Sequence, residues 1–414
     1  MGWLARVRMD VRPLRESVEF RKLFASNTIT LLGSQITEVA VLVQVTKLTG
    51  SPLAVGLLGV VQVVPVVVCS LYGGLLADRL DRRVLAFGCE AALLVITVGL
   101  LLNSLLPHPA LWVLYAAAGL AVSLAALQRP SLDAAVPRLV RKDQLAASAA
   151  LRSAGSDVSL IVGPAIGGAL MAGPGPVWAY GIDAVSFLIS IAFLFALRPI
   201  PRTGSADVPG LRGIAEGVRY ALGRHELLGS YLVDIAAMTL AFPVALFPFV
   251  AAALHASWAQ GLMFSASSVG ALLASATSGW TGGVRHQGRG IAISAAAWGL
   301  AIAGFGLAPN IGVAIAFLVL SGVADMYSGI FRITLWNGTI PDEMRGRLAG
   351  LEVLSYEVGP VLGQVRGGAM ASRLGIRFTL ATGGIACVLA SGGVTAALPR
   401  LWRFEAPVSL NVCA

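Results

Sequence analysis

Residues 73–83 read GGLLADRLDRR and place five charged side chains within six positions of a chain that is otherwise nearly uncharged there. Apolar runs flank this stretch, one from about residue 52 and one ending near residue 106. An apolar run of about 20 residues is long enough to cross the hydrocarbon core of a bilayer as a helix. The stretch therefore has the form of a short polar loop between two membrane spans.

The rest of the chain has the composition of an integral membrane protein. It has 414 residues, of which 57% are hydrophobic and 12% charged, with a mean hydropathy of +0.80. Soluble domains carry about 25% charged residues, so a soluble fold is excluded. No HExxH, GxSxG or Walker sequence occurs, and the histidines and cysteines form no metal-ligand spacing. We therefore expect no enzyme, no catalytic residue, no metal and no cofactor.

Apolar segments of about 20 residues or more recur twelve times, too long and continuous for the strands of a barrel. They run over 24–47, 52–77, 84–106, 109–128, 147–172, 176–197, 226–253, 257–280, 290–308, 311–336, 349–372 and 377–398. In lipid only helices or closed barrels satisfy the backbone. The sequence thus predicts an all-α membrane protein with twelve transmembrane helices.

Basic residues are distributed unevenly between the two sides of these spans. Of the 30 Lys and Arg residues, 25 lie in the N-terminal segment, alternate loops and tail of one side, and the opposite loops hold only Lys47, Arg373 and Arg377. Positive charge marks the cytoplasmic side, so both termini are predicted to be cytoplasmic. This distribution accounts for the net charge of +9 as a topology signal, and no nucleic-acid partner is expected.

A polar, Pro/Gly/Ser-rich linker over 198–225 divides the chain into halves of six spans, residues 1–197 and 226–414. The fifth and eleventh spans share a Gly-Pro motif 196 residues apart, which fits a duplicated six-helix unit and two pseudo-symmetric bundles. Glycine permits close helix approach and proline bends a helix. These residues could serve tight helix packing, or they could form bent helices that line the interface where the two halves move. They are Gly163, Pro164, Gly167, Gly168, Gly359 and Pro360.

The stretch from Gly74 to Arg83 closely resembles the G-x-L-a-D-r-x-x-r-r/k signature of the major facilitator superfamily, at the same loop between spans 2 and 3. Residues 47–59, 127–151 and 341–351 resemble a bacterial exporter subgroup that includes enterobactin-type siderophore exporters and macrolide-efflux-like proteins. The resemblance implies two six-helix bundles, a central cavity, alternating access and use of a proton or ion gradient.

By this resemblance, the signature forms a cytoplasmic gate. Asp78 is expected near the start of span 11, where a carboxylate meets the positive end of a helix. Gly74 would let span 2 approach span 11, and the arginines Arg79, Arg82 and Arg83 would pair with acids of neighbouring loops. The alternative is that the arginines only anchor the topology. The matching loop at 278–290 has no acid equivalent to Asp78, which departs from the family pattern.

Ionisable residues inside membrane spans are costly and usually face a cavity. Asn27, Thr30, Ser34 and Glu38 share one face of span 1 by helical periodicity, and Asp325 and Arg332 share a face of span 10. In the superfamily, spans 1, 4, 7 and 10 line the cavity. The candidates for proton coupling or substrate recognition are therefore Asn27, Ser34, Glu38, Asp234, Asp325 and Arg332.

Arg332 is the expected partner of Asp325, and each candidate acid has the alternative of an interhelical pair or a helix-end position. That alternative is preferred for the remaining intramembrane acids, which are Glu90, Asp183, Glu352 and Glu357. Phe242, Phe247 and Phe249 in span 7 would suit a bulky amphipathic ligand, or would lie in the core or in lipid.

These observations together predict a secondary active transporter that exports a small amphipathic molecule, such as a drug, siderophore or secondary metabolite. The proton gradient is the expected energy source, and the expected partners are a small-molecule substrate, protons and the lipid bilayer. We expect a monomer in the bacterial inner (plasma) membrane. An importer or a non-transporting membrane sensor on the same fold is the alternative.

Overall fold

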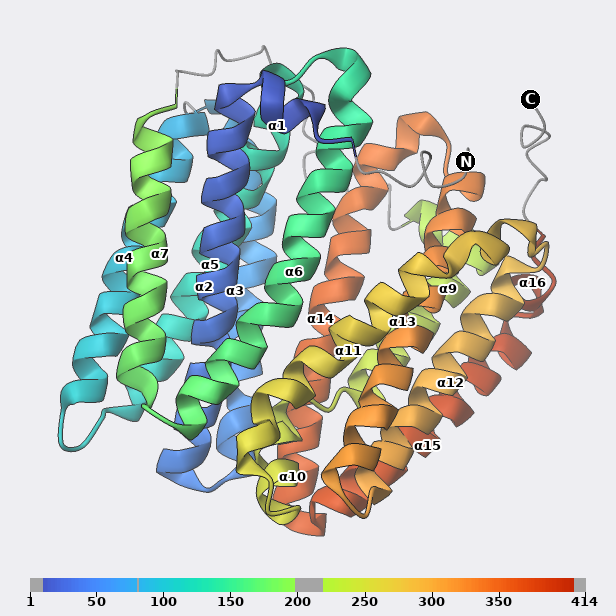
Figure 1. Ribbon diagram of the computed structural model, residues 1–414. Helices are drawn as coiled ribbons and strands as arrows, with labels where there is room; N and C mark the ends of the chain where they lie inside the picture. The colour runs from blue at the N-terminus through green and yellow to red at the C-terminus, as the bar shows by residue number, and fades with distance from the viewer. Residues whose placement is uncertain (1–9, 80–81, 198–218, 406–414) are drawn as a thin grey trace, which may run out of the picture. The chain divides into compact units, whose positions relative to one another are not determined.

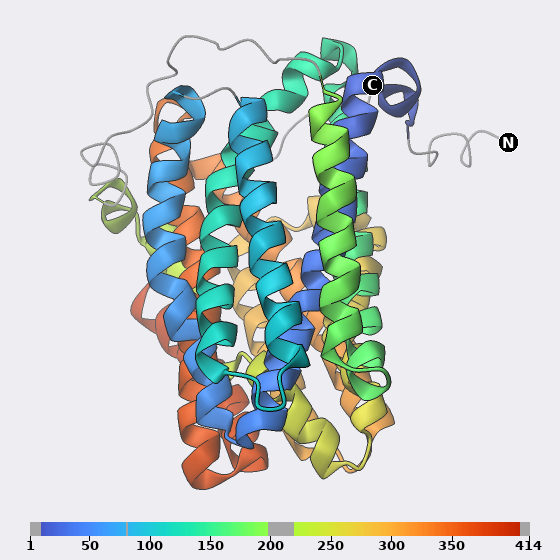
Figure 2. The same ribbon diagram turned by 90° about the vertical axis from the view of Figure 1, so that its left-hand side faces the viewer.

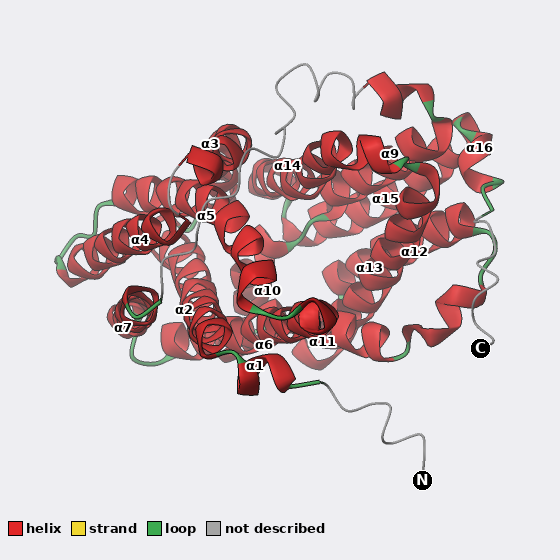
Figure 3. Cartoon of the chain, turned by 90° about the horizontal axis from the view of Figure 1, so that it is seen from above, coloured by secondary structure: helices red, strands yellow, loops and turns green. Residues whose placement is uncertain are grey.

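The structure is a computed structural model of the chain that describes residues 10–79, 82–197 and 219–405. Within these residues every regular element is a helix, and Figure 3 shows only helices and loops. The prediction of an all-α fold is confirmed. The chain divides into two compact units: unit 1 comprises Met1–Leu48 and Val64–Asp207, and unit 2 comprises Thr49–Val63 and Val208–Ala414.

Unit 1 is built from long helices that run side by side (Figures 1 and 2). They are preceded by the short helix α1 (Arg12–Glu16), and the chain divides between the units within α3. The long helices are α2 (Val18–Thr49), α3 (Pro52–Arg79), α4 (Arg82–Leu105), α5 (Leu111–Leu139), α6 (Leu145–Ala172, after the 3₁₀ turn Lys142–Gln144) and α7 (Pro176–Phe195).

Unit 2 repeats this plan with one difference, a broken first helix. Its helices are α9 (His225–Ala241), η2 (Val244–Leu246), α10 (Phe247–Ala253), η3 (Ser257–Ala259), α11 (Gln260–Ala276), η4 (Ser278–Gly283), α12 (Gln287–Leu307), α13 (Ile311–Thr339), α14 (Asp342–Leu374), α15 (Ile376–Ala397) and α16 (Pro399–Trp402).

Ten helical segments of the described chain are long and apolar enough to cross a membrane. Ten of the twelve predicted spans coincide with these segments, and the other two coincide with α3 and α14. Charged residues along α14 lower its mean hydropathy, and only Pro52–Val63 of α3 counts as an apolar helix among the described residues. A twelve-span architecture is consistent with this arrangement.

The predicted span 226–253 coincides with the apolar segment His225–Ala253, but its helix is interrupted. Pro243 has no backbone N–H, and it disfavours helical geometry in the residue before it. Phe242 accordingly has ψ 116°, which ends α9, and the chain resumes through η2 into α10. The seventh span is therefore two helical segments joined at Phe242 and Pro243.

Glycines pack the same pair of helices in each unit. In unit 1, a Cβ on Gly163 would lie 2.5 Å from Cβ of Gln35, and one on Gly167 would lie 2.9 Å from the Ile36 carbonyl oxygen of α2. In unit 2, a Cβ on Gly359 would lie 2.8 Å from Cβ of Met238, and Gly363 contacts the Met238 carbonyl of α9. Span 5 thus packs on span 1 as span 11 packs on span 7.

The turns after these glycine-rich helices also match. Gly175 precedes α7 with φ +95°, and Gly375 precedes α15 with φ +88°. Such positive φ angles are open to glycine but strained for other residues, so both turns depend on it. The two units therefore share a turn as well as a helix contact.

Each unit has its own hydrophobic core. The core of unit 2 includes Phe247, which is only 2% exposed and meets the rings of Phe264 and Phe305 edge-on at centroid distances of 5.1 and 5.6 Å. Such contacts add to the stabilisation from apolar burial. Phe247 is therefore a core residue of unit 2, which is the alternative that the sequence left open for the aromatic residues of span 7.

Candidate functional site

Asp183 of α7 lies at the centre of a hydrogen-bond cluster inside unit 1. Its side chain is 1% exposed and accepts hydrogen bonds from Thr37 of α2 at 2.6 Å, Thr97 of α4 at 3.3 Å and Ser186 at 3.2 Å. Gly33 of α2 makes room for this cluster, since its Cα faces Asp183 and Ser186 directly. Among the described residues no ion pair forms at Asp183, so hydroxyl donors alone satisfy this carboxyl group.

Glu90 of α4 forms a second cluster of the same kind, and its side chain is 2% exposed. It accepts a hydrogen bond from Gln128 of α5 at 2.9 Å and one from Thr30 of α2 at 3.2 Å. One turn earlier in α2, the hydroxyls of Ser26 and Ser190 are 2.6 Å apart. These polar contacts join α2, α4, α5 and α7 through the interior of unit 1.

The predicted polar face of span 1 is divided between two environments. Thr30 is buried against Glu90, whereas Glu38 is exposed and accepts a hydrogen bond from Gln35 at 3.2 Å. Asn27 and Ser34 are half-buried. Four residues predicted on one helical face therefore point partly into unit 1 and partly out of it, and Glu38 is an exposed acid of α2.

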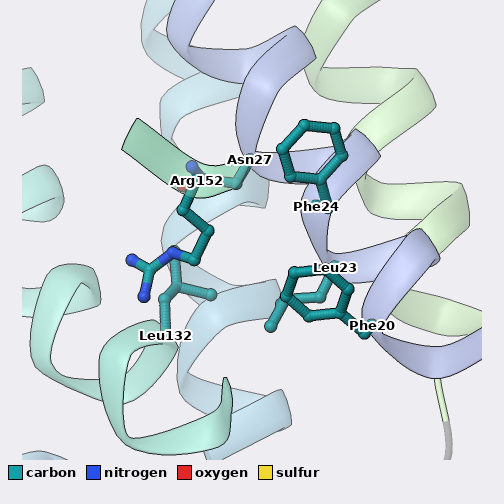
Figure 4. Close-up of a pocket in the computed structure, with 6 residues that line it drawn as sticks. All are labelled: Phe20, Leu23, Phe24, Asn27, Leu132 and Arg152. Carbon is teal, nitrogen blue, oxygen red and sulfur yellow. The ribbon is translucent and has the colours of Figure 1, made fainter. Parts of the chain in front are cut away.

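Asn27 lines a small cavity of about 10 Å³, enough for roughly one water molecule. Figure 4 shows its walls, which are Phe20, Leu23, Phe24 and Asn27 of α2, Leu132 of α5 and Arg152 of α6. Arg152 also borders an open hollow of about 350 Å³ on α6, together with Ser153, Ser156 and Asp157. The outer surface of α6 thus carries polar and charged groups at positions within a membrane span.

In unit 2, Asp234 of α9 and Arg332 of α13 form a buried ion pair, with each side chain 3% exposed. An intramembrane charge is tolerated when it is paired in this way. Asp325 lies on α13, half-buried, seven residues before Arg332. Arg332 therefore has Asp234 as an ion-pair partner, and its expected partnership with Asp325 stays a prediction.

Arg83, one of the predicted gate arginines, contacts the end of α7. Its Nε donates a hydrogen bond to the Leu194 carbonyl oxygen at 3.0 Å, a second nitrogen donates to the Phe195 carbonyl, and its guanidinium lies 5.8 Å from the Phe195 ring centroid. Lys22 binds the Ala196 carbonyl oxygen at 2.6 Å. Cations at a helix C-terminus satisfy its free carbonyls and its dipole.

The surroundings of Gly74 and the side chains of the other gate residues, Asp78, Arg79 and Arg82, lie outside what the structure describes, as do the side chains of Glu352 and Glu357 in span 11. The gate assignment therefore stays a prediction.

Arg366 of α14 is a residue whose role the sequence did not indicate. It is half-buried within span 11, and its Nε donates a hydrogen bond to the Thr239 carbonyl oxygen of α9 at 3.0 Å. The signal that could have found it is a proline in span 7, because a proline leaves one carbonyl without its helical donor. Sequence reasoning missed Thr37 and Thr97 as partners of Asp183. They lie on other helices, and their separation from Asp183 along the chain does not indicate a contact.

The fold and these polar clusters define a class: a polytopic helical transporter made of two related units. A family model described as transmembrane secretion effector matches residues 9–410. The chain belongs to this family of the major facilitator superfamily, and it is a multi-pass membrane transporter for small molecules rather than an enzyme.

Relatives and solved structures agree with this assignment. The chain is 28% identical to the enterobactin exporter EntS of Citrobacter koseri, covering 98% of this chain and 97% of that one. It is 28% identical to EntS of Shigella boydii serotype 18 over 91% of this chain and 89% of that one.

Two solved structures share the fold at low identity. One is a D-xylose-proton symporter, with TM-score 0.72, 14% identity and coverage of 93% and 97%. The other is the nucleoside transporter NupG, with TM-score 0.67, 15% identity and coverage of 92% and 98%.

Proposed function

We propose that this protein exports a small amphipathic molecule across the bacterial inner membrane by alternating access, with the proton gradient as its energy source. The observation that carries this proposal is the similarity, over nearly the full length of both chains, to proteins named as enterobactin exporters. The proposal includes cytoplasmic termini and a monomeric protein, and the substrate need not be that of the relatives.

The polar surface of unit 1 supports a substrate path. Glu38 of α2 and Asp157 of α6 are exposed, and the half-buried Arg152 borders the hollow beside Asp157, all within segments long enough to cross the membrane. Ionisable side chains at such depths face protein or a water-filled cavity, because exposure to lipid is costly. Glu38 is our leading candidate for proton coupling, followed by Asp234 and Asp325.

Transport is tested by expressing the chain in an efflux-deficient bacterium and by reconstituting it in vesicles with an imposed pH gradient. A panel would include a siderophore, a macrolide and a lipophilic cation. We expect accumulation of at least one compound in the cell to fall, and the effect to vanish when a protonophore collapses the gradient. Gradient-driven uptake would identify an importer, and no movement of any compound would contradict transport.

Glu38→Gln is expected to abolish transport against a gradient. Losing one essential charge-dependent interaction lowers the initial rate about tenfold or more. Asp143→Asn, at an exposed acid within the 3₁₀ turn before α6, is the matched control and should leave the rate unchanged. Equal rates for Glu38→Gln and the unmodified protein would remove Glu38 from the proton path.

A further inference from the structure

The break in the seventh span leaves carbonyl groups in the last turn of α9 without helical donors, and Pro243 accounts for one of them. In a continuous helix the N–H of residue 243 would donate to the carbonyl of Thr239, four residues earlier. Pro243 has no N–H, so this bond cannot form. The preceding bond survives, since Phe242 donates to the Met238 carbonyl oxygen at 3.2 Å. The Thr239 carbonyl, which lies within a membrane span, is therefore left without its helical hydrogen-bond donor.

Arg366 of α14 supplies the missing donor. Its Nε lies 3.0 Å from the Thr239 carbonyl oxygen, and its Nη1 lies 3.4 Å from Sδ of Met370 on the same helix. The guanidinium also places positive charge near the C-terminal end of α9, where the helix dipole is negative. One side chain thus compensates both the lost hydrogen bond and the exposed helix end.

Room for this guanidinium is built into the neighbouring helix. A Cβ on Gly383 of α15 would lie 2.7 Å from Nη2 of Arg366 and would also contact the Leu240 carbonyl. Any larger residue at position 383 would displace the arginine or α9. The guanidinium of Arg366 therefore fits between α9 and α15 only because residue 383 is a glycine. The packing of α15 thus fixes the position of this side chain.

Unit 1 provides an internal comparison. The Gly-Pro motifs of α6 and α14 align position 366 with Leu170, and the glycine contacts align Met238 with Gln35 or Ile36, and hence Pro243 with Ala40 or Val41. At either position helix α2 continues unbroken to Thr49. The proline and the arginine occur together in one repeat and are both missing from the other, as expected if one compensates the other.

We propose that Arg366 is the positioning residue that holds the broken seventh span, α9–η2–α10, in the geometry that transport requires. The proposal rests on the proposed transport function for its last step. Its structural core, the dependence of Arg366 on Pro243, is independent of any substrate.

A double-mutant cycle of Arg366→Leu and Pro243→Ala tests that core in the full-length protein. Arg366→Leu should lower the midpoint of thermal unfolding in detergent, because the Thr239 carbonyl loses its donor. Pro243→Ala restores an N–H for that carbonyl, so adding Arg366→Leu to Pro243→Ala should cost much less than it does alone. Arg373→Leu, at an exposed arginine of the same helix, is the control and should behave additively.

Accessibility of α10 provides a readout that general destabilisation would not reproduce. In a variant lacking the four native cysteines, Ala251→Cys places a thiol at a buried position of α10. Its reaction rate with a maleimide should rise about tenfold with Arg366→Leu, as for loss of one hydrogen bond to a charged group. Arg366→Lys keeps a charged donor, so its labelling rate should be close to the slow rate of the protein with Arg366.

The outcomes separate this proposal from the proposed function. Additive unfolding midpoints in the cycle, or unchanged labelling of Ala251→Cys, would overturn the role of Arg366 whether or not the protein transports. If Arg366→Leu does not fold, recovery of folded protein by Pro243→Ala supports the role, and no recovery contradicts it. Strong coupling together with unchanged transport in Arg366→Leu would overturn the final step alone, and an inactive unmodified protein would overturn the proposed function.

Discussion

Buried carboxyl groups are accommodated in two chemically different ways. Asp183 and Glu90 in unit 1 accept hydrogen bonds from neutral hydroxyl and amide donors, whereas Asp234 in unit 2 pairs with Arg332. Neutral donors tolerate either charge state of a carboxyl group, since a protonated carboxyl can also donate. An ion pair in the interior depends on both charges, because removing one leaves the other without compensation.

Arg332→Gln should therefore destabilise unit 2 more than Asp234→Asn and Arg332→Gln together. Breaking a buried pair by removing one partner costs about 3–5 kcal/mol, whereas removing both charges costs less. Unfolding in detergent, followed by circular dichroism, measures the difference. The exposed pair Arg141–Asp143 is the control, and neutralising it should change stability by less than about 1 kcal/mol. A double variant whose loss of stability equals the sum of the losses of Arg332→Gln and Asp234→Asn would show that the pair is not coupled.

For individual residues, the sequence indicated which polar side chains lie within the spans better than it indicated which side chains they contact. Helical periodicity grouped Thr30 with Glu38, but positions that differ by a fraction of a turn can reach different neighbours, and Thr30 meets Glu90. The shared face of span 10 suggested Asp325 for Arg332 and stays a prediction, but the sequence did not indicate Asp234, which pairs with Arg332 from another helix. Contacts between helices depend on packing that no single helix encodes.

Helix contacts in both units depend on glycines that face a neighbouring backbone. Gly363 of α14 lies against the Met238 carbonyl of α9. A Cβ added at Gly363 would lie 2.7 Å from Cβ of Phe242. A methyl group there must push α14 away from α9. This contact is one of the two that make spans 5 and 11 equivalent.

Gly363→Ala is expected to destabilise the protein by about 1–3 kcal/mol through overpacking. Gly99→Ala is the matched control, because Gly99 lies within α4 with no atom inside 4 Å of an added Cβ. Helix propensity alone should stabilise that control by up to about 1 kcal/mol. Thermal unfolding of both variants decides the issue, and a stabilised Gly363→Ala would show that α14 can shift without cost.

Span positions were predictable because hydrophobic runs of this length have one outcome in lipid. The break at Phe242 and Pro243 was not predicted, although the proline was visible, because many membrane helices continue through a proline when neighbours satisfy the freed backbone groups. Here the neighbour is Arg366, and its contribution depends on how α14 packs. The element boundaries thus follow from composition, and the break follows from tertiary structure.

On the scale of the whole molecule, charge distribution predicts which ends face the cytoplasm. Cysteines introduced at exposed positions test it in a variant without native cysteines. His108→Cys and His255→Cys should react with an impermeant maleimide in intact cells, whereas Asp143→Cys should react only after permeabilisation. The reverse pattern would contradict the predicted orientation.

Helix α3 has a consequence for any attempt to treat the two halves as separate modules. Its first turns, within Thr49–Val63, belong to unit 2, where Gly56 lies against Gly368 of α14, while its later turns belong to unit 1. A gene cut in the 198–225 linker would therefore give a C-terminal polypeptide missing a piece of its own packing. The N-terminal polypeptide would in turn carry Thr49–Val63, which belongs to unit 2, so the two halves of the sequence do not coincide with the two compact units.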